Sequence, residues 1–171
     1  MKARKDKVVF NGRLIKLIVK RVKLPNGYVA TLETIKHPGA SLIVPLLSKD
    51  KVVLLRQLRP VINSYIYELP AGTIDGNETP LECAKREIVE EIGYSAGKFT
   101  LLGKIYPVPG YSTERIFIYK ARRLKKAELK NEKDEVIESR VFTKSGIRKL
   151  FREGRIVDAK TIAAFAFCGW L

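Results

Sequence analysis

The chain has 171 residues, of which 46% are hydrophobic, and it carries a formal net charge of +15. Because it contains no apolar run of transmembrane length and no signal peptide, we expect a cytoplasmic protein without a membrane span. Its two cysteines lack metal-binding spacing and exclude a disulfide framework, and its positive charge favours anionic partners, either phosphorylated small molecules or nucleic acid.

The N-terminal part of the chain is expected to form strands. Alternating, β-branched residues predict strands at 8–11 and 14–24, and Pro25-Asn26-Gly27 predicts a hairpin turn before a strand at 28–36. We therefore expect residues 1–36 to form an antiparallel β extension and residues 37–171 to form the main domain. Three more strands are predicted at 41–47, 52–58 and 65–69.

The rest of the chain combines helices with strands. The order of strands, helix, strands and helices predicts an α+β fold with a mixed sheet. The lysine-rich stretch 125–133 is expected to be a loop. The predicted helices are 79–93, 144–153 and 160–170, and the predicted strands are 99–106, 115–121 and 136–142.

The helix at 79–93 has well-marked ends. Thr79 is the expected N-cap, Pro80 suits the first turn, and Glu82 completes a capping box. Gly93 is the expected C-terminal stop. An apolar stripe should face the core, while the glutamates of the helix project from a different side. The stripe consists of Leu81, Ala84, Ile88 and Ile92.

Three glutamates crowd this helix. Spacings of three and four residues place Glu87, Glu90 and Glu91 close together on the helix surface, where like charges repel and weaken the helix. A fold tolerates such crowding most readily when a hard divalent cation with oxygen ligands, such as Mg²⁺ or Mn²⁺, lies between the carboxylates. The alternative is a solvated acidic surface, which is common on helices.

Glycine, glutamate and arginine recur around this helix at fixed spacings. Gly72 is followed after five residues by Glu78, and then after seven by Arg86-Glu87. Glu90-Glu91, one spacer residue and Gly93 complete the pattern. The pattern resembles the complete signature of the Nudix hydrolases.

Segments outside the signature resemble the ADP-ribose pyrophosphatases of that family. The resemblance implies a Nudix fold, with a mixed β-sheet sandwiched between helices and an N-terminal antiparallel strand extension. It implies metal-dependent hydrolysis of the pyrophosphate bond of ADP-ribose, or of a related nucleoside diphosphate sugar, to AMP and ribose 5-phosphate. It also implies a homodimer in which the N-terminal strands are exchanged and complete the active site. The segments are 36–40, 55–59, 67–72, 107–110 and 154–161.

The resemblance also implies roles for single residues. Glu87 and Glu91, assisted by Glu90, should bind Mg²⁺ or Mn²⁺ together with the carbonyl oxygen of Ala71, and Glu90 is also a catalytic candidate. Arg86 should pair with a nearby glutamate and hold the helix geometry. The positions with a structural role in the signature are Gly72, Glu78, Arg86 and Gly93.

A general base is also needed to orient or deprotonate water. By resemblance it is Glu132 or Glu135, in the loop before the last strand, and the sequence leaves this choice open. Arg56 matches a substrate-contacting arginine whose planar fork suits phosphate oxygens, although a surface strand residue is the alternative. His37, the single histidine, is expected to be structural. The other substrate-binding candidates are Glu33, Glu68, Pro109, Gly110 and Tyr111.

Two further functions are compatible with these patterns. One is a Nudix hydrolase of other nucleotides, such as dinucleoside polyphosphates. The other is a nucleic-acid-binding regulator built on a Nudix fold. Because such regulators often lack part of the signature, which is intact here, the sequence argues against nucleic acid as the partner.

Overall fold

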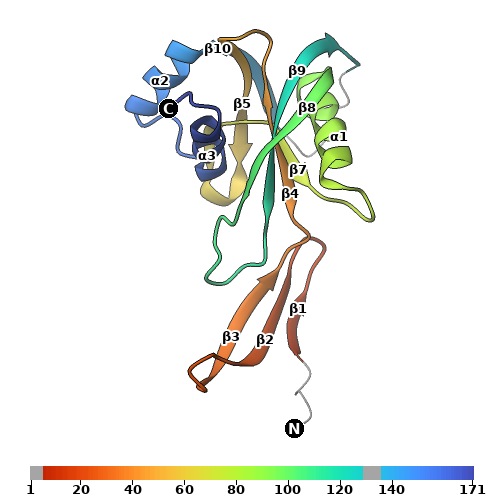
Figure 1. The fold of residues 1–171 in the computed structure, drawn as a ribbon, viewed down its shortest axis with the longest axis vertical. Helices are drawn as coiled ribbons and strands as arrows, with labels where there is room; N and C mark the ends of the chain where they lie inside the picture. Colours follow the sequence, from red (N-terminus) through yellow and green to blue (C-terminus); the bar gives the residue numbers. More distant parts are fainter. Residues whose placement is uncertain (1–5, 129–135) are drawn as a thin grey trace.

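The computed structural model describes residues 6–128 and 136–171. Within these residues the chain forms a body of two sheets and three α-helices, from which a third sheet projects (Figure 1). The observed mixture of helices and sheets confirms the predicted α+β class.

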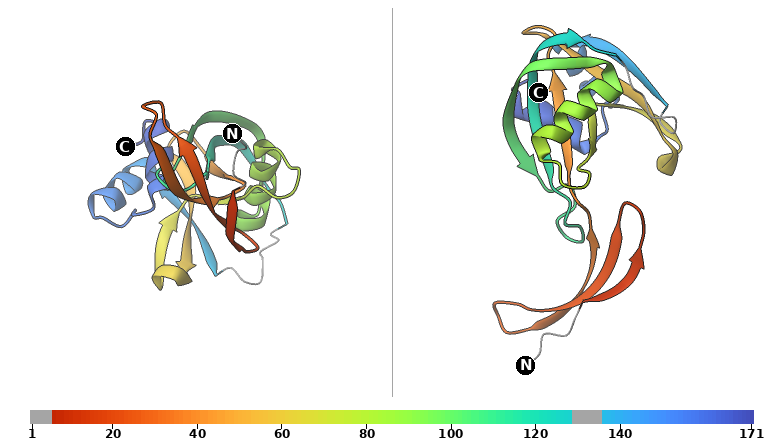
Figure 2. Two further views of the ribbon diagram at one scale, coloured as in Figure 1. Left: turned by 90° about the horizontal axis from the view of Figure 1, so that it is seen from below. Right: turned by 90° about the vertical axis from the view of Figure 1, so that its right-hand side faces the viewer.

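The projecting sheet is the N-terminal extension. It has three antiparallel strands in chain order, β1 (Lys7–Asn11), β2 (Lys16–Lys23) and β3 (Val29–Lys36). Gly27 closes the β2–β3 hairpin with a φ of 86°, a left-handed conformation that favours glycine. Two views at right angles show the sheet lying below the body rather than against it (Figures 1 and 2). The predicted antiparallel extension is therefore observed.

The larger sheet of the body is mixed. Its strand order is β7 (Ala71–Thr73), β4 (Ala40–Pro45), β9 (Ile116–Lys126) and β8 (Tyr94–Ile105), with β4 and β9 parallel and the other pairs antiparallel. The second sheet is antiparallel, with the order β10 (Ile137–Thr143), β5 (Lys51–Arg59) and β6 (Ser64–Glu68). A 3₁₀ turn, Pro60–Ile62, joins β5 to β6.

Helices cover both faces of the mixed sheet (Figure 1). Helix α1 (Pro80–Ile92) packs on one face, and α2 (Lys144–Arg152) and α3 (Ala159–Phe167) lie on the other side. Successive side chains of a strand point to opposite faces, so Leu42 of β4 joins the core beneath α3 while Ile43 joins the core beneath α1. Strand β4 is buried along its whole length for this reason.

Several predicted boundaries and orientations are wrong. Strand β7 was not predicted, because three small residues carry no strand pattern of their own. Strands β8 and β9 extend beyond the predicted 99–106 and 115–121, since they pair from Tyr94 opposite Lys126 onwards. Lys125 and Lys126 therefore belong to a strand rather than a loop.

Beside the predicted mixed sheet, β10, β5 and β6 form a sheet of their own. The apolar stripe of α1 was partly misassigned. Leu81 is 36% exposed at the start of the helix, whereas Cys83 is buried with Ala84 and Ile88. None of the described helices has the length and apolar character needed to cross a membrane.

Candidate active site

The ends of α1 are fixed as the sequence predicts. The backbone N–H of Glu82 donates to Thr79 Oγ1 at 3.3 Å, and the backbone N–H of Thr79 donates to Glu82 Oε2 at 2.7 Å. This reciprocal pair is a capping box. The bond from Thr79 lowers the pKa of Glu82. At the other end, Gly93 ends the helix with a φ of 66°.

Arg86 joins three glutamates of the signature. Its Nη2 atom donates to Glu78 Oε1 at 2.8 Å, and its Nη1 atom donates to Glu87 Oε1 at 2.6 Å and to Glu90 Oε2 at 2.8 Å. The bond to Glu78 is the main cause that raises the pKa of Arg86, and it also lowers the pKa of Glu78. The expected pairing of Arg86 with a nearby glutamate is confirmed. We call Glu78, Glu87, Glu90 and Glu91 the acidic cluster.

Strand β7 packs against the acidic cluster. The backbone N–H of Ala71 donates to Glu91 Oε2 at 2.8 Å. Gly72 lies so close to Glu87 that a Cβ on this glycine would be 1.7 Å from Glu87 Oε1. Glu87 and Glu91 are only 8% and 4% exposed, so they are buried between α1 and β7 rather than displayed on a solvated acidic face.

Cys83 links the same two elements. Its thiol donates to the carbonyl oxygen of Gly72 at 3.4 Å. Burial is the main cause that raises the pKa of Cys83 to about 12, so the thiol stays protonated and keeps its donor. Cys83 therefore acts as a small structural contact between α1 and β7.

The donor set of the acidic cluster suits a hard divalent cation. Buried carboxylates and a neighbouring backbone strand offer oxygen atoms, which Mg²⁺ and Mn²⁺ prefer. Across residues 6–128 and 136–171, no group of three or more acidic, histidine or cysteine side chains is arranged as a ready metal site. Instead the Arg86 guanidinium bridges Glu87 and Glu90 and supplies the positive charge between them.

A second group of charged residues lies on β5 and β6. The Arg56 guanidinium lies 4.0 Å from the centre of the Tyr65 ring, a cation–π contact that orients it. Arg59 forms a two-pronged ion pair with Glu68, with distances of 2.6 and 2.8 Å, and Lys160 also bonds Glu68. Glu68 is 1% exposed, and the two cations outweigh the effect of burial and lower its pKa.

Sequence reasoning missed Arg59 and Lys160. A signal was present, because Glu68 interrupts an otherwise continuous apolar run that includes Ile66 on its own face, and such a run is typical of a strand buried on both faces. A buried carboxylate needs cationic partners, so basic residues elsewhere should have been sought.

The predicted substrate residues near the extension lie on two segments that meet. Pro109, Gly110 and Tyr111 form part of the β8–β9 loop, and the carbonyl oxygen of Tyr111 accepts a hydrogen bond from the backbone N–H of Ile35 at 2.7 Å. Glu33, on the same strand as Ile35, is exposed. His37 Nδ1 accepts a bond from the backbone N–H of Gly39 at 3.0 Å, which agrees with a structural histidine.

The structure thus brings the signature residues together and places the other candidates on other elements. Ala71, Gly72 and the acidic cluster meet at the β7–α1 junction. Arg56 and Glu68 lie on the adjacent sheet, and the loop 109–111 lies at the base of the extension. Glu132 and Glu135 lie outside the described residues.

Comparison with known proteins shows which family this chain resembles. The family model of the NUDIX domain matches residues 36–165. The chain is 35% identical to the ADP-ribose pyrophosphatase of Bacillus subtilis over 161 residues, which cover 93% of this chain and 87% of that protein. It is 33% identical to the methanol dehydrogenase activator of Bacillus methanolicus over 95% of this chain and 89% of that protein.

A solved structure described as an ADP compounds hydrolase shares the fold. It has a TM-score of 0.82 at 24% sequence identity, and the match covers 96% of this chain and 89% of that one. The family model spans most of the chain, and its matched range contains the whole signature from Gly72 to Gly93. On these grounds the chain belongs to the Nudix family.

Proposed function

We propose that this protein hydrolyses the pyrophosphate bond of ADP-ribose, or of a related nucleoside diphosphate sugar, and releases AMP and ribose 5-phosphate. The observation that carries the proposal is the acidic cluster at the β7–α1 junction, in which Glu87 and Glu91 are buried and Arg86 pairs with the other members and with Glu87. Near full-length similarity to an ADP-ribose pyrophosphatase supports the choice of substrate.

The proposed cofactor is Mg²⁺ or Mn²⁺. Glu87 and Glu91, with Glu90 and the carbonyl oxygen of Ala71, are the residues that would hold it. When bound, such a cation neutralises pyrophosphate charge and provides a water molecule of lowered pKa. The hydrogen bond from Ala71 to Glu91 supports this assignment, since it fixes the backbone of β7 beside the carboxylates.

The remaining roles belong to residues around the cluster. Arg56 would bind phosphate oxygens, and its contact with Tyr65 holds the guanidinium in one orientation before substrate arrives. Glu132 or Glu135 would orient and deprotonate the attacking water. Glu68, with both oxygens held by cations, would act by fixing Arg59 rather than by touching the substrate.

We further propose that the protein is a two-fold symmetric homodimer in which the extension packs on a second copy. The sheet β1–β3 projects from the body, and all five residues of β1 are exposed. Phe10 and Tyr28 are 56% and 67% exposed, an arrangement typical of an interface rather than of a free surface. A partner covering this sheet would also lie beside Glu33 and the loop 109–111.

A substrate panel tests the proposed reaction. Purified protein is incubated with ADP-ribose, GDP-mannose, diadenosine polyphosphates and nucleoside triphosphates, with Mg²⁺ or Mn²⁺, and the products are separated by ion-exchange chromatography. We expect AMP and ribose 5-phosphate from ADP-ribose, with the highest kcat/KM of the panel. Higher kcat/KM for dinucleoside polyphosphates would instead favour the alternative Nudix specificity.

A further inference from the structure

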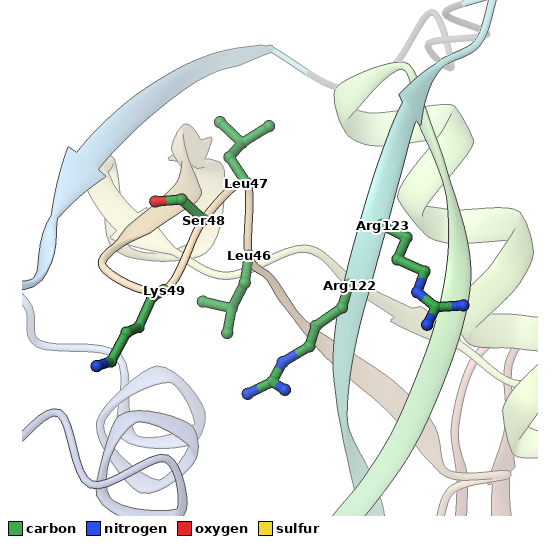
Figure 3. A pocket seen from close by; sticks show the side chains of 6 residues that line it. All are labelled: Leu46, Leu47, Ser48, Lys49, Arg122 and Arg123. Carbon is green, nitrogen blue, oxygen red and sulfur yellow. The ribbon is translucent and has the colours of Figure 1, made fainter.

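A cavity of about 430 Å³ lies between the β4–β5 turn and the end of β9. Three of its lining side chains are cationic: Lys49 comes from the turn, and Arg122 and Arg123 come from β9 (Figure 3). Leu46, Leu47 and Ser48 complete the lining, which includes no acidic residue and no member of the acidic cluster. The cavity is therefore electropositive and separate from the candidate active site.

The cations around this cavity, Lys49, Arg122 and Arg123, have no ion-pair partner among residues 6–128 and 136–171. Arg122 pairs directly with Lys98 across the β8–β9 ladder, and like charges in such positions repel. Asp50, in the same turn as Lys49, accepts a hydrogen bond from the Ser48 hydroxyl at 2.8 Å.

The backbone at Arg123 is unusual. Its φ is 58°, in the left-handed region that residues other than glycine adopt rarely and at a cost in energy. Gly97 of β8 provides the space, because a Cβ there would lie 3.2 Å from Arg123 Cβ. Lys49 and Arg122 point to the same side of the turn, and Arg123 extends along the other side of β9 (Figure 3). Because Arg123 extends away from Lys49 and Arg122, these two side chains are the cations that can face one ligand together.

We propose that this cavity is a second anion site that binds a small ligand carrying an oligophosphate group. A guanidinium fork matches phosphate oxygens and a lysine adds a mobile point charge, so Arg122 and Lys49 together suit a chain of phosphates. Because both side chains lie at the surface, each contributes little by itself, and a multiply charged ligand is needed to engage both of them. The volume lies in the range of small-ligand sites.

Binding of inorganic tripolyphosphate to the full-length, metal-free protein tests the proposal by isothermal titration calorimetry. We expect one molecule bound per chain. Arg122→Gln and Lys49→Gln should each weaken binding about two- to fivefold, and the double variant about tenfold. Lys104→Gln, which removes the same charge from an exposed position elsewhere on β8, should leave binding unchanged. Arg123→Gly removes a cation that points away from Lys49 and Arg122, at a left-handed residue that glycine adopts freely, so it should weaken binding less than Arg122→Gln while the melting temperature is kept.

Three results would overturn the proposal. Equal weakening by Lys104→Gln and Arg122→Gln would mean that the overall positive field, and not the cavity, attracts the ligand. Loss of binding in Arg56→Gln with full binding in Arg122→Gln would place the ligand in the candidate active site. Tighter binding of an oligouridylate, with a steep salt dependence that Lys98→Gln and Lys120→Gln reduce, would identify a nucleic-acid surface instead. None of these results bears on the proposed hydrolysis, which the substrate panel tests independently.

Discussion

Gly72 and Glu87 meet where β7 crosses α1, and they approach so closely that a Cβ on the glycine would overlap the carboxylate at 1.7 Å. Two further links hold the same junction, the bond from Ala71 to Glu91 and the bond from Cys83 to the Gly72 carbonyl. The first glycine of the signature is therefore explained by space: any side chain at this position would displace a carboxylate of the acidic cluster.

Gly72→Ala should abolish most of the hydrolytic activity. The new methyl group must push Glu87 away or separate β7 from α1, and misplacement of a catalytic group by about 1 Å can cost about 10²-fold in rate. Overpacking should also lower the free energy of unfolding by about 1–3 kcal/mol. Steady-state kinetics and urea denaturation measure both effects.

Gly146→Ala is the matched control for Gly72→Ala. This glycine lies in α2, where a Cβ would meet only the Thr143 hydroxyl at 3.3 Å and a Phe142 ring carbon at 3.9 Å. Turnover should match the wild type. A fully active Gly72→Ala protein would contradict the proposed position of the active site.

Glu91→Gln should remove metal-dependent activity while the fold survives. The amide keeps an oxygen that can accept the Ala71 N–H, so the β7–α1 junction should persist, but the negative charge is lost. We expect turnover to fall by orders of magnitude and the rise in melting temperature on adding Mg²⁺ to disappear. Glu153→Gln, on the C-cap of α2, is the control. Near-normal turnover at saturating metal would refute the metal-site assignment.

The two loop glutamates should differ in their contribution. Only one of Glu132 and Glu135 can be the principal base, so one Gln variant should lose about 10²- to 10⁴-fold in kcat, as is typical when a general base is removed, and the other should lose far less. Single-turnover kinetics with ADP-ribose measure the chemical step. If both variants are fully active, the base lies elsewhere.

Most of the architecture could be predicted from local patterns. Capping residues fixed α1 to within one residue at each end, because a capping box and a terminal glycine act through neighbours in sequence. The predictions failed where pairing decides the structure. Strand β8 begins at Tyr94 only because its ladder with β9 continues to Lys126, and a run of lysines carries no strand signal by itself.

In the candidate site, too, features set by local spacing could be predicted, whereas features set by long-range contacts could not. Spacing alone placed Glu87, Glu90 and Glu91 together and left open a metal site or a solvated acidic surface, because nothing local shows that β7 covers Glu87 and Glu91. Glu68 pairs with Arg59 and with Lys160, and the second pair joins residues 92 positions apart in sequence. Such a long-range pair cannot be predicted from local sequence patterns.

Apolar residues of the extension should control assembly. Light scattering on the wild type should give about twice the monomer mass of 19.4 kDa. Phe10→Asp combined with Tyr28→Asp places charges on exposed positions of the projecting sheet, so it should yield a folded monomer with greatly reduced kcat/KM. Deleting residues 1–36 should abolish dimerisation and ADP-ribose binding together. Val157→Asp, exposed on the body, should remain dimeric, and a fully active monomer would exclude a shared active site.

The ion pair between the buried Glu68 and the partly exposed Arg59 should make stability depend on pH. Glu68→Gln leaves Arg59 and Lys160 without their counter-charge and should lower the free energy of unfolding by about 2–4 kcal/mol at pH 7, the lower values reflecting a 38% exposed Arg59 that water screens. Because the folded-state pKa of Glu68 is lowered, its contribution is complete above the unfolded value of about 4.3 and is lost as the pH falls through the folded-state pKa. Chemical denaturation between pH 3 and 8 should therefore show the unfolding free energies of the wild type and Glu68→Gln converging only at the acidic end.

Glu138→Gln, which removes an exposed carboxylate paired with Arg140, is the control and should follow the wild type across this range. A difference that stays constant down to pH 3 would mean that the loss comes from packing and not from charge.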